Sequence, residues 1–398
     1  MGLISQRIEA MEESATIAMA QKARDLKSKG VDVISLSLGE PDFKTPAHIL
    51  KAAKEAIDSG NYFAYPPVPG YQDLRESIAN KFKTENGIPC TAANVVVSTG
   101  AKQSLVNIFM SIIDPEDEVI VLSPYWVSYA DLIKVVEGIP VFVKGSFEND
   151  FKATVEQVAK AISPKTKALI YSSPCNPSGS VFTKEELEAI ANVLVPHENI
   201  LVIADEIYEH INFTGKHASM GSFPQIQDRV ITVNGVAKGF AMTGWRIGYI
   251  SAPLEIAKAC GKIQGQFTSG ANSIAQRATL AALESDLEPT KEMAKEYFDR
   301  RQLVYDLLIE IPGIKVNMPK GAFYFFPEVS SYFGKSYGDY SINSAEDLCM
   351  YLLSDAHVSL VTGDAFGSPE CVRLSYAASV KDLKEAIHRI KVALEKLN

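Results

Sequence analysis

The chain is poor in the features that mark secreted and metal-binding proteins. Its 398 residues hold five cysteines, which are odd in number, widely spaced and without a C-x-x-C pair: Cys90, Cys175, Cys260, Cys349 and Cys371. This spacing predicts neither a disulfide framework nor a zinc site, so we expect reduced thiols. The six histidines form no H-x-x-x-H or histidine–carboxylate motif in the sequence. Metal catalysis therefore has no support from the sequence.

Basic clusters and long apolar runs are also missing. The formal net charge is -9, from 39 basic and 48 acidic residues, which argues against a nucleic acid or an anionic membrane as partner. No apolar run is long enough to span a bilayer. Residues 1–20 mix charged with apolar side chains, unlike a signal or transit peptide. We therefore expect a cytoplasmic protein that acts on small molecules.

Three common catalytic signatures are absent as well. No G-x-G-x-x-G follows a predicted strand, no G-x-x-x-x-G-K-[ST] occurs, and there is no G-x-S-x-G. These absences weaken the hypotheses of a dinucleotide-dependent dehydrogenase, a nucleoside triphosphatase and a serine hydrolase.

The pattern that is present predicts an α/β fold. From about residue 47, amphipathic segments alternate with short apolar runs such as 95–98, 168–172 and 200–204. Buried strands separated by helices imply a mostly parallel central sheet that is covered by helices on both faces. After about residue 256 helices dominate, including a long charged one near 287–311, and strand-like and helical segments follow.

This change of pattern predicts three parts. Residues 1–46 form an N-terminal segment that packs on the smaller domain or on a partner. Residues 47–290 form a large domain, and residues 291–398 form a smaller α/β domain.

The most informative stretch is residues 234–246, which lies between two apolar runs and contains Lys238 and Arg246. A lysine reacts near neutral pH when it is desolvated or lies close to another cation. An arginine presents donors that suit a phosphate. A cofactor with an aldehyde and a phosphate would use both residues, and pyridoxal 5'-phosphate fits. The alternative is a solvated loop lysine and a surface arginine.

Other polar residues follow the predicted strands, where ligands bind in such sheets. After the run at 95–98, the turn at Gly100, Ala101 and Lys102 enters a helix whose first N–H groups could hold a phosphate. Trp126 could stack on a flat ring, or it could belong to the core. Asn176 stands between two prolines in a rigid loop.

Asp205 comes at the end of a buried strand, where a carboxylate needs a cation or a strong donor. A protonated pyridine nitrogen would serve, and Tyr208 could reach the neighbouring ring hydroxyl. A salt bridge within the fold is the alternative.

Together these segments resemble the aminotransferases of fold type I that depend on pyridoxal phosphate. The resemblance rests on S-P-x-N-P-x-G at 173–179, D-E-x-Y at 205–208, A-K at 237–238 and M-T-G-W-R at 242–246. It is closest to the bacterial aspartate aminotransferases of subgroup Ib, through G-E-P-D-F at 39–43, V-L-S-P-Y-W-V-S-Y at 121–129, D-E-I-Y-E-H at 205–210 and V-R-L-S-Y at 372–376. These motifs span nearly the whole chain, in order.

The resemblance implies a role for each residue that matches a motif. Lys238 would bind the cofactor covalently and move the substrate proton, and Asp205 would keep the ring nitrogen protonated. The remaining cofactor contacts would come from Tyr208 and Asn176 at the ring oxygen, Trp126 on the ring face, Arg246 with the turn Gly100, Ala101 and Lys102 at the phosphate, and Tyr65 from a neighbouring subunit. A homodimer with shared sites is implied.

The resemblance also implies how a substrate is held. Arg373 would bind the α-carboxylate beside the backbone of Gly39, with Trp126 and Asn176 next to the substrate, and Lys102 and Thr16 would meet a distal carboxylate. Family members that accept prephenate carry a lysine shortly before that threonine, whereas this chain has Glu12 and Glu13, so we do not expect prephenate activity. Ala237 replaces a serine found in many relatives, which predicts fewer phosphate donors.

The function that this resemblance implies is an aspartate aminotransferase, which transfers the amino group of L-aspartate to 2-oxoglutarate by a ping-pong mechanism between the pyridoxal and pyridoxamine forms. Two alternatives remain open. One is the same fold with another specificity, such as an aromatic or alanine aminotransferase, or a C–S β-lyase. The other is a non-catalytic pyridoxal-binding regulator, which would need an appended DNA-binding domain.

Overall fold

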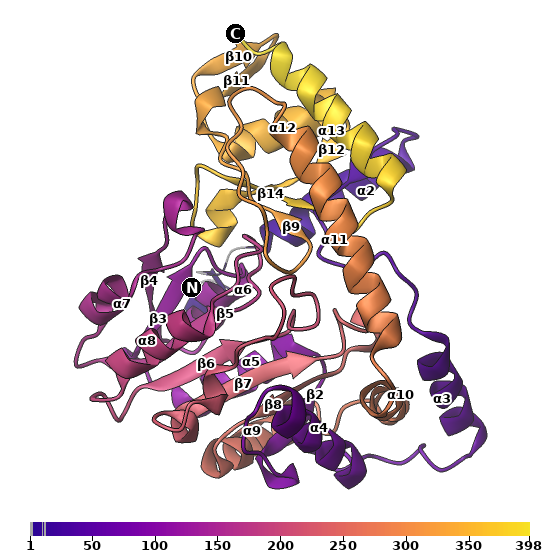
Figure 1. Ribbon diagram of the computed structural model, residues 1–398, viewed down its shortest axis with the longest axis vertical. Helices are drawn as coiled ribbons and strands as arrows, with labels where there is room; N and C mark the ends of the chain where they lie inside the picture. The colour runs from indigo at the N-terminus through magenta and orange to yellow at the C-terminus, as the bar shows by residue number, and fades with distance from the viewer. Residues whose placement is uncertain (1–2, 10, 12) are drawn as a thin grey trace.

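The computed structural model describes residues 3–9, 11 and 13–398. A seven-stranded sheet lies at its centre, in the order β2-β8-β7-β6-β5-β3-β4 (Figure 1). The strands are β2 (Val95–Ser98), β3 (Glu118–Ser123), β4 (Ile139–Lys144), β5 (Thr166–Ser172), β6 (Leu201–Asp205), β7 (Val230–Gly235) and β8 (Gly248–Ser251). Only β8 runs antiparallel to its neighbours, so the prediction of a mostly parallel sheet in an α/β fold is confirmed.

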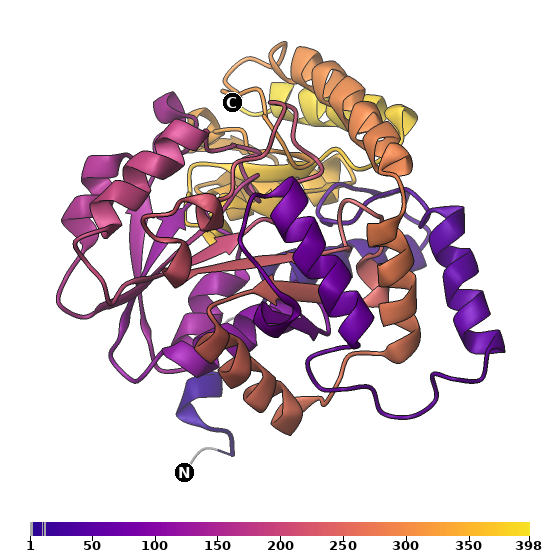
Figure 2. The same ribbon diagram turned by 60° about the horizontal axis from the view of Figure 1, so that its bottom comes forward.

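Helices cover both faces of this sheet because successive strand residues point to opposite sides. On one face, Val119, Val121 and Ile170 pack against α5 (Ala101–Ile112), α6 (Ser128–Val135) and α9 (Leu254–Phe267). On the other face, Ile120 and Leu169 pack against α7 (Val155–Ala161) and α8 (Lys184–Leu194). At the β2–β8 edge, that second face is covered by α3 (Ala47–Asp58), α4 (Gln72–Glu85) and α10 (Ser273–Glu284). Figure 2 shows α3 along α10 at the rim of the molecule.

A second hydrophobic core lies at the top of Figure 1, on the side of the carboxyl ends of the parallel strands. It gathers α2 (Ala15–Ser28), α11 (Glu288–Leu308), α12 (Ala345–Asp355) and α13 (Val380–Glu395). An antiparallel sheet of β13 (Val361–Thr362), β14 (Val372–Ser375) and β9 (Tyr324–Phe325) packs among them. The predicted boundaries at 46 and 290 stay a prediction, although α11 begins close to the second one.

The remaining elements are short. The strand β1 (Ile34–Ser35) pairs in parallel with β12 (Val358–Ser359), and β10 (Lys335–Tyr337) forms a hairpin with β11 (Tyr340–Ile342). The helix α1 (Gln6–Glu9) precedes α2, and single 3-10 turns are η1 (Ala92–Asn94), η2 (Phe147–Asn149), η3 (Met220–Ser222), η4 (Gln227–Arg229), η5 (Thr243–Trp245), η6 (Ser330–Tyr332) and η7 (Gly363–Phe366). Within the described ranges, no helix is both long and apolar enough to cross a bilayer.

Candidate active site

A cavity of about 610 Å³ lies between the carboxyl ends of the parallel strands and the second core. The strands β3, β5, β6 and β7 are followed by lining residues, and β9 and β14 contribute others from the opposite side. Of the predicted site residues, the cavity brings together Thr16, Gly39, Ala101, Lys102, Trp126, Asn176, Asp205, Tyr208, Lys238, Arg246 and Arg373. Gly100 lies directly behind Arg246, and Tyr65 lies apart.

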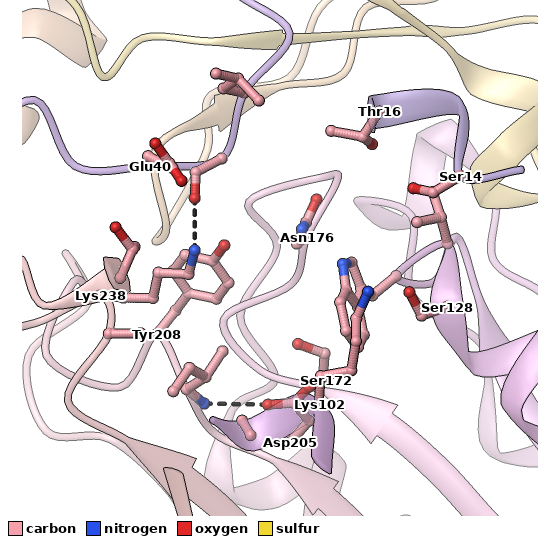
Figure 3. Close-up of a pocket in the computed structure, with 18 of the residues that line it drawn as sticks. Ser14, Thr16, Glu40, Lys102, Ser128, Ser172, Asn176, Asp205, Tyr208 and Lys238 are labelled. Atoms are coloured by element: carbon pink, nitrogen blue, oxygen red, sulfur yellow. Dashed lines mark hydrogen bonds between the residues drawn. The ribbon is translucent and has the colours of Figure 1, made fainter. Parts of the chain in front are cut away.

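Lys238 lies in the turn after β7 and points into this cavity (Figure 3). Its Nζ donates a hydrogen bond to the Gly39 carbonyl oxygen at 2.5 Å and lies 5.6 Å from the centre of the Tyr208 ring. Burial lowers the pKa of Lys238 to about 8 against the opposing effect of Glu40, which also lines the cavity, and Arg373 and Arg246 act in the same direction as burial. The expected cation is thus present, but burial is the larger cause. A pKa near 8 makes the neutral, nucleophilic amine available close to neutral pH.

Asp205 is the last residue of β6, and it is buried at the floor of the cavity, which it lines. Its Oδ2 accepts a hydrogen bond from the Tyr129 hydroxyl at 2.6 Å, and its Oδ1 accepts one from the Ile207 N–H at 3.3 Å. Burial raises the pKa of Asp205 to about 6. Both of these donors are neutral, and Asp205 forms no ion pair with any described residue. The site therefore has a buried carboxylate that lacks a cation, and the alternative of an internal salt bridge does not hold.

Arg373 is the opposite case, a buried cation that lacks a carboxylate. Its side chain comes from β14 and is only 1% exposed. Nη1 donates to Oδ1 of Asn176 at 2.9 Å and Nη2 donates to the Ser37 carbonyl at 2.6 Å, whereas the buried Nε has no partner in the described part of the chain. Burial lowers the pKa of Arg373, as expected for a cation removed from water.

Two tyrosines in this region were missed by the sequence analysis. Tyr129 holds Asp205, and Tyr324 lies beside Arg373, whose guanidinium carbon is 4.6 Å from the ring centre. The Tyr324 hydroxyl is also 2.7 Å from the Tyr208 hydroxyl. Tyr129 ends the motif at 121–129, but its contact with Asp205, like that of Tyr324 with Tyr208, joins segments that are distant in the sequence.

Arg246 lies at the N-terminus of α5. Gly100, at the N-cap position, has φ +82°, and a Cβ there would collide with the Arg246 guanidinium. Arg246 itself adopts a left-handed conformation at φ +58°, and its Nη1 donates to the Thr243 carbonyl at 3.0 Å. No side chain caps the helix, so a guanidinium and free N–H groups at the positive end of the helix dipole form a site for an anion.

Lys102 and Thr16 line another part of the cavity (Figure 3). The Lys102 Nζ lies 5.0 Å from the Trp126 ring centre, and burial together with nearby Arg246 lowers the pKa of Lys102. The Thr16 hydroxyl is buried without a hydrogen-bond partner among the described residues. The hydroxyl-bearing residues Ser14 and Ser128 line the same region.

Two predictions concern residues outside this cavity. Tyr65 lies between α3 and α4 and is 93% exposed, so its predicted contact needs a second subunit. The expectation about prephenate rests partly on Glu12, which lies outside the described residues, and on the exposed Glu13.

Comparison with known proteins shows the family to which the chain belongs. A family model described as "Aminotransferase class I and II" matches residues 31–390. An aspartate aminotransferase of Geobacillus stearothermophilus is 41% identical, over 98% of this chain and 99% of that protein. A bifunctional aspartate aminotransferase and glutamate/aspartate-prephenate aminotransferase of Petunia hybrida is 44% identical, over 98% and 82%.

Solved structures agree with these sequence matches. The aspartate aminotransferase of Rhizobium meliloti superimposes with a TM-score of 0.96 at 38% identity, over 100% of both chains. The aspartate aminotransferase of Thermus thermophilus with maleate gives a TM-score of 0.93 at 42% identity, over 99% of this chain and 100% of that one.

Proposed function

Because the chain belongs to the class I and II aminotransferases, we propose that it transfers the amino group of L-aspartate to 2-oxoglutarate with pyridoxal 5'-phosphate as cofactor. The observation that carries this proposal is the pattern of charge in the cavity. A carboxylate without a cation, Asp205, faces the same space as a lysine of lowered pKa and three cations without carboxylates, Lys102, Arg246 and Arg373.

The residues present fit pyridoxal 5'-phosphate. Asp205 would pair with a protonated ring nitrogen, which supplies the missing cation, and Arg246 with the N-terminus of α5 would hold the phosphate. Lys238 would hold the aldehyde carbon. Tyr208 and Asn176 would bind the ring oxygen, and Trp126 would cover the ring face. When bound, this cofactor supplies an electron-accepting ring that stabilises the negative charge left on the substrate Cα after deprotonation.

Lys238 is the proposed base. With a pKa of about 8, its amine can take the proton from the substrate Cα, and it would deliver that proton to C4' of the cofactor, on the other side of the substrate nitrogen. The hydrogen bond to the Gly39 carbonyl fixes the position of the Nζ in the cavity that Arg373 also lines. Burial of the surrounding groups keeps bulk water from competing for the proton.

Arg373 is the proposed partner of the α-carboxylate. Asn176 and the Ser37 carbonyl fix the plane of its guanidinium, while Nε has no partner. A carboxylate can accept two parallel hydrogen bonds from such a fork, which holds the Cα–H bond at a defined angle to the base.

Lys102 and Thr16 are proposed to select substrates with a second carboxylate. A positive charge and an unpaired hydroxyl together suit an anionic group, and burial of the Thr16 oxygen makes it costly to leave unpaired. The dicarboxylate maleate named with the Thermus thermophilus structure supports this assignment. Phenylalanine or alanine would leave both groups without a partner.

A homodimer is part of the proposal. The exposed Tyr65, with Phe63 at 76% exposure beside it, would reach the phosphate region of a neighbouring subunit. We propose that each site is completed by its partner in this way.

The test is a half-reaction with the purified protein and pyridoxal 5'-phosphate. Aspartate alone should change the visible absorbance of the bound cofactor, and 2-oxoglutarate should restore it. A panel of aspartate, alanine, phenylalanine and cystathionine separates the alternatives: a larger kcat/KM for phenylalanine or alanine, or release of a thiol from cystathionine, would overturn the aspartate specificity. No absorbance change with any amino acid would overturn aminotransferase activity itself.

A further inference from the structure

A buried ionic cluster lies directly behind the cavity. Its members are Lys81 and Glu85 on α4, Asn86 just after that helix, and Glu206, Glu209, His210, His217 and Ser219 from the segment that follows β6. Three of them, Glu206, Glu209 and His210, are neighbours in the motif D-E-I-Y-E-H, and the fold brings the others against them. We refer to these eight residues as the rear cluster.

The rear cluster is tightly connected. Lys81 is paired with Glu209, and its Nζ donates to Oδ1 of Asn86 at 2.7 Å. The Asn86 amide then donates to Oε2 of Glu209 at 2.6 Å and to Oε2 of Glu206 at 3.2 Å. These four groups thus form a continuous network from α4 to the end of β6.

Two further groups hold Glu206, which is fully buried. The Ser219 hydroxyl donates to its Oε2 at 2.6 Å, and Nε2 of His217 lies 3.1 Å from the same oxygen. Against the effect of burial, Glu206 raises the pKa of His217, which favours an ion pair. Burial also opposes the charge on Glu209, but Lys81 and the histidines His210 and His217 lower the pKa of Glu209 to about 2.

The segment 205–210 joins this cluster to the cavity. Asp205 and Tyr208 line the cavity, whereas Glu206, Glu209 and His210 belong to the rear cluster. The backbone is fixed as well, since the Glu206 N–H donates to the Val233 carbonyl at 2.9 Å. A shift of the cluster would therefore move both cavity residues.

The cluster also touches the turn that carries Lys238. A Cβ on the next residue, Gly239, would lie 2.8 Å from Nδ1 of His210, so glycine permits the imidazole to pack on this backbone. The His210 ring packs edge-to-face on Phe240 with centres 5.4 Å apart, and its Nε2 lies 3.0 Å from Glu85. The rear cluster thus packs, through His210, against the two residues that follow Lys238.

We propose that the rear cluster positions Asp205, Tyr208 and Lys238, and so sets the orientation and affinity of the bound cofactor. None of its members touches the reacting atoms, so they act as positioning residues. This inference rests on the proposed cofactor. Interconnected buried polar networks are rigid, and the loss of one partner leaves another charge uncompensated.

Two variants test the proposal. Glu206→Gln keeps the shape but removes a charge, and the double variant Lys81→Met/Glu209→Met replaces an ion pair by apolar groups of similar volume, a change that buried pairs often tolerate. The control is Leu394→Ala, which removes packing from a buried residue of the second core that does not line the cavity; it belongs to α13, at the top of Figure 1.

The measurements are the dissociation constant of pyridoxal 5'-phosphate, the visible circular dichroism of the bound cofactor, and kcat and KM for aspartate. Both variants should bind the cofactor about tenfold more weakly, with altered dichroism and a lower kcat at similar KM. Leu394→Ala should lower only the melting temperature.

Wild-type dissociation constants and dichroism in a folded Glu206→Gln would overturn the proposal, whether or not the double variant folds. Failure of the wild-type protein to bind pyridoxal 5'-phosphate would instead overturn the proposed function.

Discussion

The two sides of the segment 205–210 differ in whether their buried charges have oppositely charged partners. On the rear side, Lys81, Glu209, Glu206 and His217 each lie against an opposite charge. On the cavity side, Asp205 accepts hydrogen bonds only from neutral donors, and Arg373 donates hydrogen bonds only to neutral acceptors. A buried charge without an oppositely charged partner costs free energy, so Asp205 and Arg373 lower the stability of the folded protein when no ligand is bound. The contrast indicates that charges of a ligand, not of the fold, complete the cavity side.

The largest expected effect comes from Lys238→Ala. Loss of the proposed base and covalent anchor should reduce kcat for aspartate by at least about 10⁴-fold, while the protein still folds. The measurement is a coupled steady-state assay with 2-oxoglutarate. The exposed Lys258→Ala on α9 serves as the matched control and should retain full activity. A Lys238→Ala variant with activity close to wild type would refute the role of this lysine.

Asp205→Asn should cause the second-largest loss of activity. The amide cannot stabilise a protonated ring nitrogen, so kcat should fall about 10³-fold, within the range seen for loss of a preorganised electrostatic group. Bound cofactor should remain detectable by absorbance. If Asp205 served only to hold Tyr129, then Tyr129→Phe would lower activity as much as Asp205→Asn does, which would contradict the proposed pairing with a cofactor.

Arg373→Lys should lower kcat/KM for aspartate about 100-fold, because a single ammonium cannot replace two parallel hydrogen bonds to a carboxylate. The exposed pair of Arg389 with Asp32 provides the control, since Arg389→Lys changes the same chemistry away from the cavity. Equal effects of the two substitutions would show that Arg373 does not bind substrate.

Lys102→Met should act on selectivity. We expect kcat/KM for aspartate to fall about tenfold or more, and kcat/KM for phenylalanine to change little, because a hydrogen bond between charged groups contributes roughly 1.5 to 3 kcal/mol. The ratio of the two values is the readout. A proportional loss for both substrates would place Lys102 at the cofactor and not at the distal carboxylate.

The smallest effect concerns stability without cofactor. Burial raises the pKa of Asp205 to about 6, so the folded protein binds a proton more tightly than the unfolded chain does. The contribution of Asp205 to stability should therefore fall as the pH rises from about 4 to 6, and apo Asp205→Asn should be more stable than the wild type at pH 7 by about 2 to 3 kcal/mol. Urea titrations at pH 4 and pH 7 measure this difference, which should vanish at the lower pH. A destabilised variant at pH 7 would mean that the fold needs this carboxylate.

The sequence predicts best what depends on local periodicity. Apolar runs locate the strands, and the rule that ligands bind at their carboxyl ends places Asp205, Asn176 and Lys238 at the same edge of the sheet. The resemblance to a family then added Arg373 and Thr16, which no pattern in their own neighbourhood marks.

Contacts between distant segments could not be predicted in this way. Tyr324 stands in the apolar run 322–326 and looks like an ordinary core residue, yet its hydroxyl meets Tyr208. Lys81 and Asn86 lie at a helix end more than a hundred positions before Glu206, so the sequence does not show that they pair with the glutamates of the segment 205–210. The depth of burial that lowers the pKa of Lys238 is likewise a property of the assembled fold.

The lining of the cavity has a consequence for the order of events during synthesis. Thr16 lies near the start of the chain on α2, and Arg373 lies in its last tenth on β14, yet both face Lys238. The central sheet can form once β8 has left the ribosome, since all of its strands precede residue 252. A nascent chain at that stage has Lys238 and Asp205 but lacks Arg373, the proposed partner of the substrate carboxylate. If Arg373 has that role, we expect no amino acid to be bound until β14 has been synthesised, well after the sheet is able to form.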